Sequence, residues 1–256
     1  MSIQKSLEEI QSIQSKFLEF LESDGNDDYN FSNLQTLFNN QKNLNCKPII
    51  SLFFHLITKI ANNHHKNNSF YEKIDKVLAF FKIEIQNNFS QREIFNIFKS
   101  NKRIILFLIE EKYIVIDKYI LDTITSEKYI EKKYPLYFLP EIKQLENEDW
   151  FPKKDPFKML ENYHKYEWLD DINKELPNDF YENRKKGEND NLICQLIQKD
   201  SIDDFITYLN RNNISVNSII NESIYETNSF LLKTKNLTLI EYAAFNGSIQ
   251  IFNYLR

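Results

Sequence analysis

Glycine is scarce in this chain: only Gly25, Gly187 and Gly247 occur among its 256 residues. A phosphate-binding P-loop, a dinucleotide-binding G-x-G-x-x-G turn and a G-x-S-x-G nucleophile elbow each need two or more closely spaced glycines, so the sequence contains none of these motifs. Proline is scarce as well, and sandwiches and barrels use both residues at their turns. The sequence therefore predicts an all-α protein.

The spacing of apolar residues supports helices. From Ser2 to Leu21 apolar residues recur every three or four positions, as one face of an amphipathic helix requires. Further helix starts are indicated by capping-box patterns, in which a Ser or Thr is followed three residues later by Glu, Gln or Asp. These patterns are Ser32/Gln35, Ser69/Glu72, Ser90/Glu93, Ser201/Asp204 and Thr238/Glu241. Short helices in this number are typical of stacked helix pairs, so we expect a helical-repeat solenoid.

The prolines divide the chain. Five of the six prolines and both tryptophans lie between Pro135 and Pro177, and proline removes a helix amide and restricts the residue before it. We therefore expect a helical N-terminal region in residues 1–134, a connector in 135–180 with one helix near 156–176, and a second helical region in 181–256. The aromatic residues of the connector either dock on the helices or anchor a partner, and the first alternative is favoured.

The second helical region contains an internal repeat, whose two copies are 47 residues apart throughout. Each copy has the pattern of a short helix, a turn and a second short helix, which can bury its apolar face only by stacking on a neighbour. The first copy reads Leu192-Ile193-x-x-Leu196-Ile197-x-x-Asp200-Ser201-Ile202-x-x-Phe205, and the second reads Leu239-Ile240-x-x-Ala243-Ala244-x-x-Gly247-Ser248-Ile249-x-x-Phe252.

Residues 238–255 resemble an ankyrin repeat. Thr238, the Ala243–Ala244 pair and Gly247 match the family's Thr, paired Ala and turn Gly, whereas Leu239 and Glu241 replace its Pro and His. The resemblance implies an ankyrin-like end to the solenoid, with a first copy at about 190–211 and a second at about 237–256. Residues 98–112, 180–189 and 223–232 are similar to segments of the large protist ankyrin families, in which a helical region precedes divergent repeats.

The resemblance implies a protein-protein interaction module, an ankyrin-type scaffold or adaptor without catalytic activity. Its contact surface would include residues 210–235, with Tyr225, Phe230, Tyr242 and Phe245 as candidate partner-binding residues. The alternative for these four aromatics is packing between repeats. Since apolar residues of the last helix have no sequential neighbour to cover them, self-association through the C-terminal repeat is a further expectation, as is a shortened family member.

Charge and hydropathy limit the partners. The net charge of −5 comes from well-mixed acids and bases, so we expect no nucleic-acid partner. No apolar stretch is long enough for a membrane span, and we find no secretory signal pattern at the N-terminus. Two isolated cysteines, Cys46 and Cys194, fit a reducing compartment and two small core residues. We therefore expect a cytoplasmic protein.

No residue pattern indicates a catalytic, cofactor-binding or metal site. His64 and His65 are adjacent and lack a third ligand nearby in the sequence, so solvated loop residues are favoured over a metal site. His55 lies in an apolar run, where a satisfied histidine is expected. Two alternatives remain open: an enzyme or effector with an unrecognised activity in residues 1–134, and a structural fragment without a role of its own.

Overall fold

The computed structural model describes residues 3–23, 27–40, 46–63, 69–126, 134–145, 148–150 and 176–256. Within these ranges the chain forms helices and no strand, which confirms the all-α prediction. Among the described helices, we find none with the length and apolar character needed to cross a membrane. The predicted helix near 156–176, His64, His65 and Trp168 lie outside the described residues.

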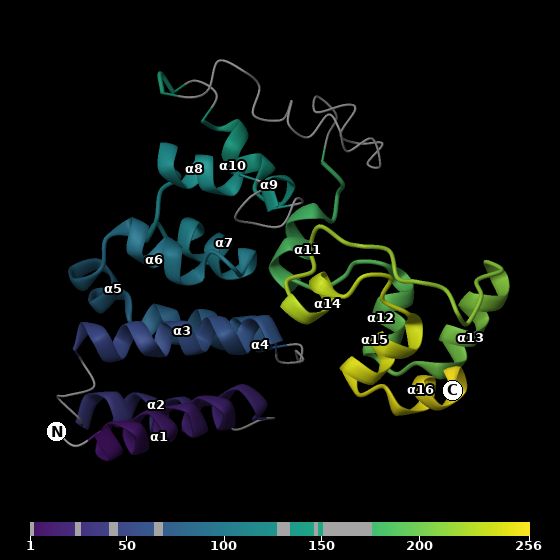
Figure 1. Ribbon diagram of the computed structural model, residues 1–256, viewed down its shortest axis with the longest axis horizontal. Coiled ribbons are helices and arrows are strands. Elements are labelled where there is room, and N and C mark those ends of the chain that lie inside the picture. Colours follow the sequence, from purple (N-terminus) through teal and green to yellow (C-terminus); the bar gives the residue numbers. More distant parts are fainter. Residues whose placement is uncertain are drawn as a thin grey trace.

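The first ten helices form layers, which we call the N-terminal stack (Figure 1). The layers run from α1 and α2, through α3 with α4 and α6 with α7, to α8–α10 at the far end. Their bounds are α1 Ile3–Glu22, α2 Asp27–Asn40, α3 Lys47–Asn63, α4 Phe70–Phe80, α5 Lys82–Asn88, α6 Gln91–Phe98, α7 Lys102–Glu110, α8 Lys118–Ile124, α9 Tyr134–Tyr137 and α10 Leu139–Lys143.

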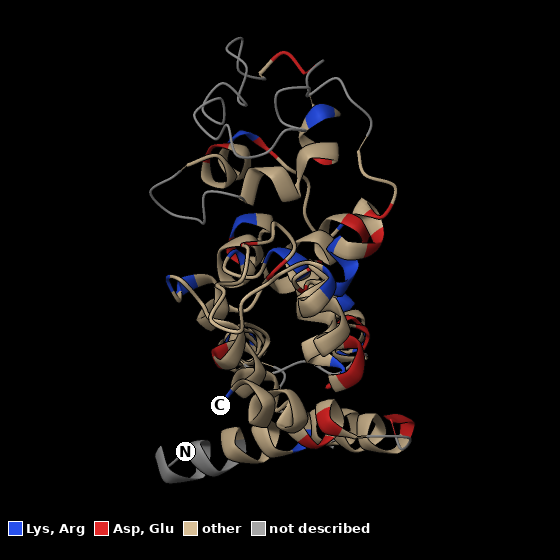
Figure 2. Ribbon diagram, turned by 90° about the vertical axis from the view of Figure 1, so that its right-hand side faces the viewer, with Lys and Arg blue, Asp and Glu red and all other residues tan. Residues whose placement is uncertain are grey.

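Helices α12 to α16 form a second body beside the stack, which we call the C-terminal unit, and α11 lies between the two bodies (Figure 1). The bounds are α11 Phe180–Lys186, α12 Leu192–Gln198, α13 Ile202–Arg211, α14 Ser229–Lys233, α15 Leu239–Asn246 and α16 Ile249–Leu255. Basic and acidic residues are interspersed along the described ribbon (Figure 2).

Each body has its own hydrophobic core. One apolar cluster runs from Ile13 in α1 to Ile142 in α10 and also takes in Phe180, Ile224 and Tyr225. A second, smaller cluster runs from Cys194 to Ile251 within the C-terminal unit. Because α9 and α10 contribute to the first cluster, the N-terminal core extends into the segment predicted as a connector. Aromatics of that segment, such as Tyr137, are therefore docked within the chain.

Both predicted copies of the 47-residue repeat form a helix pair with the same turn. Asp200 and Gly247 occupy equivalent positions and both have a left-handed backbone, with φ of 50° and 69°. The residue after each donates its amide to the first helix: Ser201 N to Leu196 O at 3.1 Å, and Ser248 N to Ala243 O at 3.0 Å. The first helices, α12 and α15, pack on each other, as do α13 and α16.

The first copy has Asp200 at the turn position where the second copy has Gly247, and the structure gives a physical reason for this difference. The carboxylate of Asp200 accepts hydrogen bonds from the amides of Gln250 and Ile251 at 3.1 and 3.0 Å, at the start of α16. A side chain in the first copy therefore caps a helix of the second copy, where amides lack partners within the helix. Asp is among the residues that tolerate a left-handed backbone best after glycine.

Helices α6 and α7 form a third pair that shares some of these local features, although the connecting residues Lys99 and Asn101 have φ of −56° and −126°. Complete capping boxes occur at Ser90/Glu93 and at Thr238/Glu241. Both α7 and α13 end at a left-handed residue, Lys112 with φ 60° and Asn213 with φ 50°. The next amide then bonds to a leucine carbonyl, from Tyr113 to Leu108 at 2.8 Å and from Ile214 to Leu209 at 3.0 Å. These capping and helix-end contacts therefore occur in both bodies, whereas the left-handed turn between paired helices occurs in α12–α13 and α15–α16.

The other three predicted capping boxes are wrong. Ser69 and Ser201 do precede helices, but their side chains make no capping hydrogen bond. Ser32 lies inside α2 rather than before a helix. The two complete boxes have extended backbone at the cap, with ψ of 156° at Ser90 and 162° at Thr238, whereas ψ is 5° at Ser69 and 79° at Ser201. The cap requires the extended geometry.

Candidate interaction surfaces

The segment between the two repeat copies begins and ends at an isolated antiparallel bridge between Ile219 and Thr238. The amide of Ile220 donates to Leu237 O at 2.7 Å, which closes the base of the segment. Between these points lie residues 221–228, which form neither helix nor strand, and the short helix α14, whose N-terminus is capped by the side chain of Asn228. This segment carries two of the four predicted partner-binding residues.

Phe230 and Phe245 form a surface pair. Their rings are stacked with centroids 5.5 Å apart and an angle of 11° between the planes. Phe230, on α14, is 51% exposed, whereas Phe245, on α15, is partly buried. A small pocket beside Phe245, reaching Leu231 and Tyr242, has room for about one water molecule. The pair is therefore an accessible aromatic surface without a deep cavity.

Tyr242 and Tyr225 are buried. Tyr242 is 1% exposed, and its hydroxyl accepts a hydrogen bond from Gln198 Nε2 at 3.0 Å, across the two repeat copies. Tyr225 is 4% exposed, and its ring packs edge-on against Phe180 with centroids 5.8 Å apart. Burial raises the pKa of both hydroxyls. The structure therefore brings Phe230 and Phe245 together at the surface and uses the two tyrosines for internal packing.

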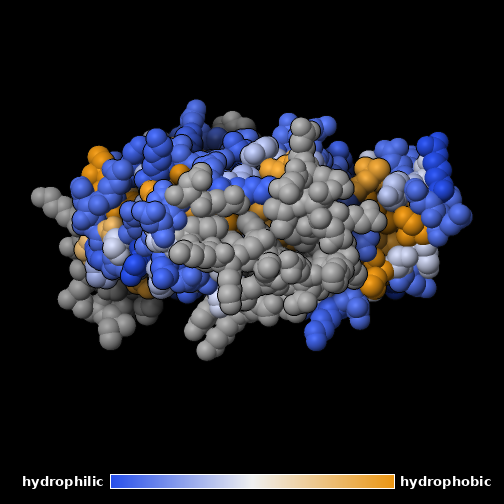
Figure 3. All heavy atoms as spheres, turned by 90° about the horizontal axis from the view of Figure 1, so that it is seen from above, coloured by the Kyte–Doolittle hydropathy of each residue, from blue (hydrophilic) through white to orange (hydrophobic). Residues whose placement is uncertain are grey.

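Exposed apolar side chains occur elsewhere on the C-terminal unit. Figure 3 shows apolar surface on this unit, at the right of the view. The exposed apolar residues of the unit include Leu192, Val216, Ile219, Ile249 and Tyr254. Val216 and Ile219 lie in the segment that follows α13, within the predicted contact surface of residues 210–235.

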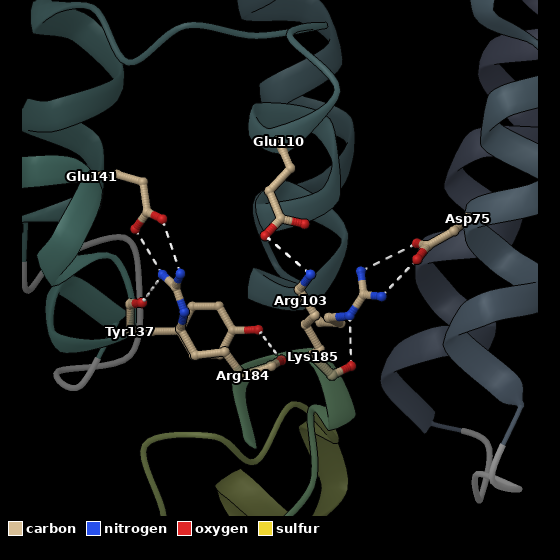
Figure 4. Close-up of polar contacts among 7 residues, drawn as sticks. All are labelled: Asp75, Arg103, Glu110, Tyr137, Glu141, Arg184 and Lys185. Carbon is tan, nitrogen blue, oxygen red and sulfur yellow. Dashed lines mark hydrogen bonds and ion pairs between the residues drawn. The ribbon is translucent and has the colours of Figure 1, made fainter. Parts of the chain in front are cut away.

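A second surface is already occupied within the chain: the contact between α11 and the N-terminal stack (Figure 4). Arg184 of α11 is 2% exposed and forms a two-pronged pair with Glu141 of α10, at 2.7 and 3.0 Å. The same guanidinium donates to Tyr137 O at 2.9 Å, and the Tyr137 hydroxyl donates to Arg184 O at 2.6 Å. Tyr137 and Arg184 thus bond reciprocally.

Arg103 of α7 reaches the end of α11 from the other side (Figure 4). Its Nε donates to Lys185 O at 2.7 Å, while its two terminal nitrogens bond to the carboxylate of Asp75 at 3.2 and 2.6 Å. Burial raises the pKa of Asp75, and the nearby Arg103 opposes that shift. Side chains of the stack therefore satisfy two of the carbonyl groups left open at the C-terminal end of α11.

A chain of polar groups continues from α11 into the stack. The Thr227 hydroxyl donates to Gly187 O at 2.7 Å and lies 2.6 Å from the Tyr71 hydroxyl. Asn101 Nδ2 lies 3.2 Å from the same Tyr71 oxygen and 2.8 Å from Asn62 Oδ1. Gly187 has a φ of 66°, and a Cβ placed there would lie 2.8 Å from the Tyr71 ring. Glycine is thus required on both conformational and steric grounds.

Sequence reasoning did not find this contact. Arg184, Lys185 and Lys186 read in the sequence only as a short basic cluster, and Glu141 lies 43 residues away from Arg184. A signal was present in the spacing of Phe180, Asn183, Arg184 and Gly187, which all lie on one helical face. That face was not recognisable as buried because it contains an arginine and an asparagine.

The remaining predictions on chemistry have mixed outcomes. Cys194 is buried, but Cys46 is exposed, so the prediction of a core position is wrong for Cys46. His55 is exposed on α3. Among the described residues, no group of three or more His, Cys, Asp or Glu side chains is arranged to hold a metal ion.

Comparisons with protein families, with curated proteins and with solved structures found no match to this chain.

Proposed function

We propose that the chain is a protein-binding scaffold or adaptor, built from helix-pair units of the ankyrin type and stacked as a solenoid. The support is the recurrence of one helix-pair geometry in α12–α13 and α15–α16, which share a left-handed turn at Asp200 and Gly247 and pack on each other. Units of this kind stabilise each other by stacking and present an extended surface for a partner.

The observation that carries the proposal is the stacked, surface-accessible pair of Phe230 and Phe245. Aromatic residues, phenylalanine included, are enriched at protein interfaces, and a few large side chains carry most of the binding energy there. On the same C-terminal unit, Val216 and Ile219 add further exposed apolar area. We propose that the partner contacts the Phe230–Phe245 pair. A cytoplasmic location is part of the proposal.

The test compares three forms of the full chain: native, the double variant Phe230→Ala/Phe245→Ala, and the control Tyr29→Ala, which removes an exposed aromatic from α2 of the N-terminal stack. Proteins captured by the native and control chains but not by the double variant are purified, and their affinities are measured by calorimetry. We expect the double variant to bind at least about ten-fold more weakly. Equal binding by all three folded chains would reject this surface.

Self-association through the C-terminal unit is a second part of the proposal. Ile249 and Tyr254 on α16 are 69% and 44% exposed. Light scattering on native chain and on an Ile249→Lys variant tests it, because a charge in an apolar contact lowers the dimer fraction. A monomeric native chain at all concentrations would remove self-association from the proposal. The alternative of an enzyme in residues 1–134 has no supporting observation among the described residues.

A further inference from the structure

Helix α11 packs against the N-terminal stack in the way that a helical ligand docks into a groove. Its buried residues are Phe180, Asn183 and Arg184, followed by the buried Gly187. This i, i+3, i+4, i+7 spacing is the one by which an amphipathic helix docks into a groove. The groove is formed by α4, α7, α9 and α10, which supply Tyr71, Arg103, Tyr137 and Glu141.

Many of the contacts in this groove are polar. Apart from Phe180, the anchors of α11 are hydrogen bonds and ion pairs: Arg184 with Glu141, and the carbonyls of residues 184 and 185 with Tyr137 and Arg103. Gly187 is linked to Tyr71 of the stack through the Thr227 hydroxyl. A buried ion pair gains little net free energy, because removing both charges from water offsets their attraction. Contacts of this polar kind between bodies of one chain resemble transient interfaces.

The fit is also incomplete. Within the described part of the chain, the Nε atom of Arg184 is buried and has no hydrogen-bond partner. A buried donor without a partner has lost its hydrogen bond to water without a replacement, which weakens the docked state relative to the open one. The two bodies have separate apolar cores, so the C-terminal unit keeps its own core when α11 leaves the groove.

We propose that the N-terminal stack contains a helix-docking site that α11 occupies as an intramolecular ligand, and that this docking is reversible. The site selects an aromatic residue, an arginine four positions later and a glycine three positions after that. The occupant in the native chain is its own residues 180–187, and a free helix of the same sequence competes for the groove.

Undocking has a consequence for the partner surface, and this step rests on the proposed function. Helix α14, which carries Phe230, packs against α3 of the stack in the docked state. Release of α11 and of the adjoining Thr227 separates α14 from α3, so the docking equilibrium controls what surrounds the Phe230–Phe245 pair. The test below involves no partner protein, so its outcome is independent of the proposed partner surface.

The experiment measures binding of a fluorescein-labelled peptide, residues 178–189, to the full chain by fluorescence anisotropy. In the native chain α11 competes for the groove, and the apparent affinity falls in proportion to the open fraction. The variant Arg184→Ala weakens the internal ligand but leaves the groove residues intact. A second variant, Gly187→Ala, weakens docking through the Tyr71 contact. The control is Arg211→Ala, at an exposed arginine of α13.

We expect both α11 variants to bind the peptide at least about ten-fold more tightly than the native and control chains. A peptide with alanine at position 184 should lose this binding, because the groove then lacks the partner of Glu141. Equal affinity for all four chains, undiminished binding of the alanine peptide, or no binding to any chain would overturn the proposal. Circular dichroism of each variant verifies that it is folded.

Discussion

The N-terminal stack and the C-terminal unit both contain short paired helices with capping boxes but bury different amounts of apolar side chain. In the stack, the ring of Phe54 contacts three other phenylalanine rings, those of Phe81, Phe89 and Phe98, with centroids 5.5 to 5.6 Å apart. In the C-terminal unit, the buried residues are mostly smaller and include Cys194 and Ala243. Aromatic packing therefore dominates the stack, whereas caps and turns carry more of the unit's stability.

Short paired helices can thus be stabilised in two ways, by aromatic packing in the stack and by backbone caps in the C-terminal unit. The Asp200 cap on α16 and the Thr238/Glu241 box hold the C-terminal helices through backbone groups. Such contacts contribute about 1 kcal/mol each, less than a fully buried phenylalanine. The C-terminal unit should therefore open at a lower free energy than the stack.

The largest expected effect is that of Phe54→Ala, in the centre of the stack. Phe54 is 0% exposed, so the substitution leaves a cavity and should lower the free energy of unfolding by about 4 to 5 kcal/mol. Among the described residues, the equally buried Phe205 of the C-terminal unit has one ring neighbour, Tyr254 at 6.3 Å, and Phe205→Ala should cost about 3 kcal/mol. Urea unfolding followed by circular dichroism measures both. If Phe205→Ala lowers the free energy of unfolding as much as Phe54→Ala or more, aromatic packing does not distinguish the stack from the C-terminal unit.

An intermediate effect distinguishes the two left-handed glycines. Gly187→Ala combines left-handed strain with a contact of 2.8 Å to Tyr71, and it should cost about 2 to 4 kcal/mol. Gly247→Ala has the same strain, but nothing lies within 4 Å of its Cβ, so it should cost about 1 to 2 kcal/mol. Thermal unfolding of the two variants gives the difference. Equal losses would show that the Gly187 site tolerates a side chain.

The smallest effect compares the two complete capping boxes. A hydrogen bond from Lys47, with further bonds from Ser90, lowers the pKa of Glu93 from 4.5 to about 2. Thr238 lowers the pKa of Glu241 without a lysine. Because both pKa values are depressed in the folded chain, these caps stabilise it above pH 4.5, and the Glu93 contribution is lost as the pH falls toward 2. Carboxyl NMR titration should show Lys47→Ala raising the pKa of Glu93 and leaving that of Glu241 unchanged. No change at Glu93 would remove Lys47 as the cause.

The helices and the repeat could be predicted because their signals are local. Residues 2–21 show the helical period directly, and α1 spans Ile3–Glu22. The 47-residue repeat predicted two helix pairs, and both form with equivalent turns at Asp200 and Gly247. Capping was only partly predictable, because the Ser or Thr side chain acts only where tertiary structure leaves its backbone extended.

The contact between α11 and the stack could not be predicted, because its partners are far apart in sequence. The chain has 32 basic and 37 acidic residues, so many pairings compatible with Arg184 exist, and composition does not single out Glu141. Likewise, the sequence did not distinguish Tyr225, which packs on Phe180, from Phe230, which is exposed. Aromatic residues occupy cores and interfaces alike.

Native-state hydrogen exchange, resolved by peptide mass spectrometry at increasing urea concentration, tests the central claim of two separately stabilised bodies joined by polar docking. The account predicts that amides in α11–α16 exchange through an opening of lower free energy than amides in α3, α4 and α7. The Arg184→Ala variant should lower the first opening free energy and leave the second unchanged. One common opening free energy for all these helices, lowered equally by Arg184→Ala, would contradict the account.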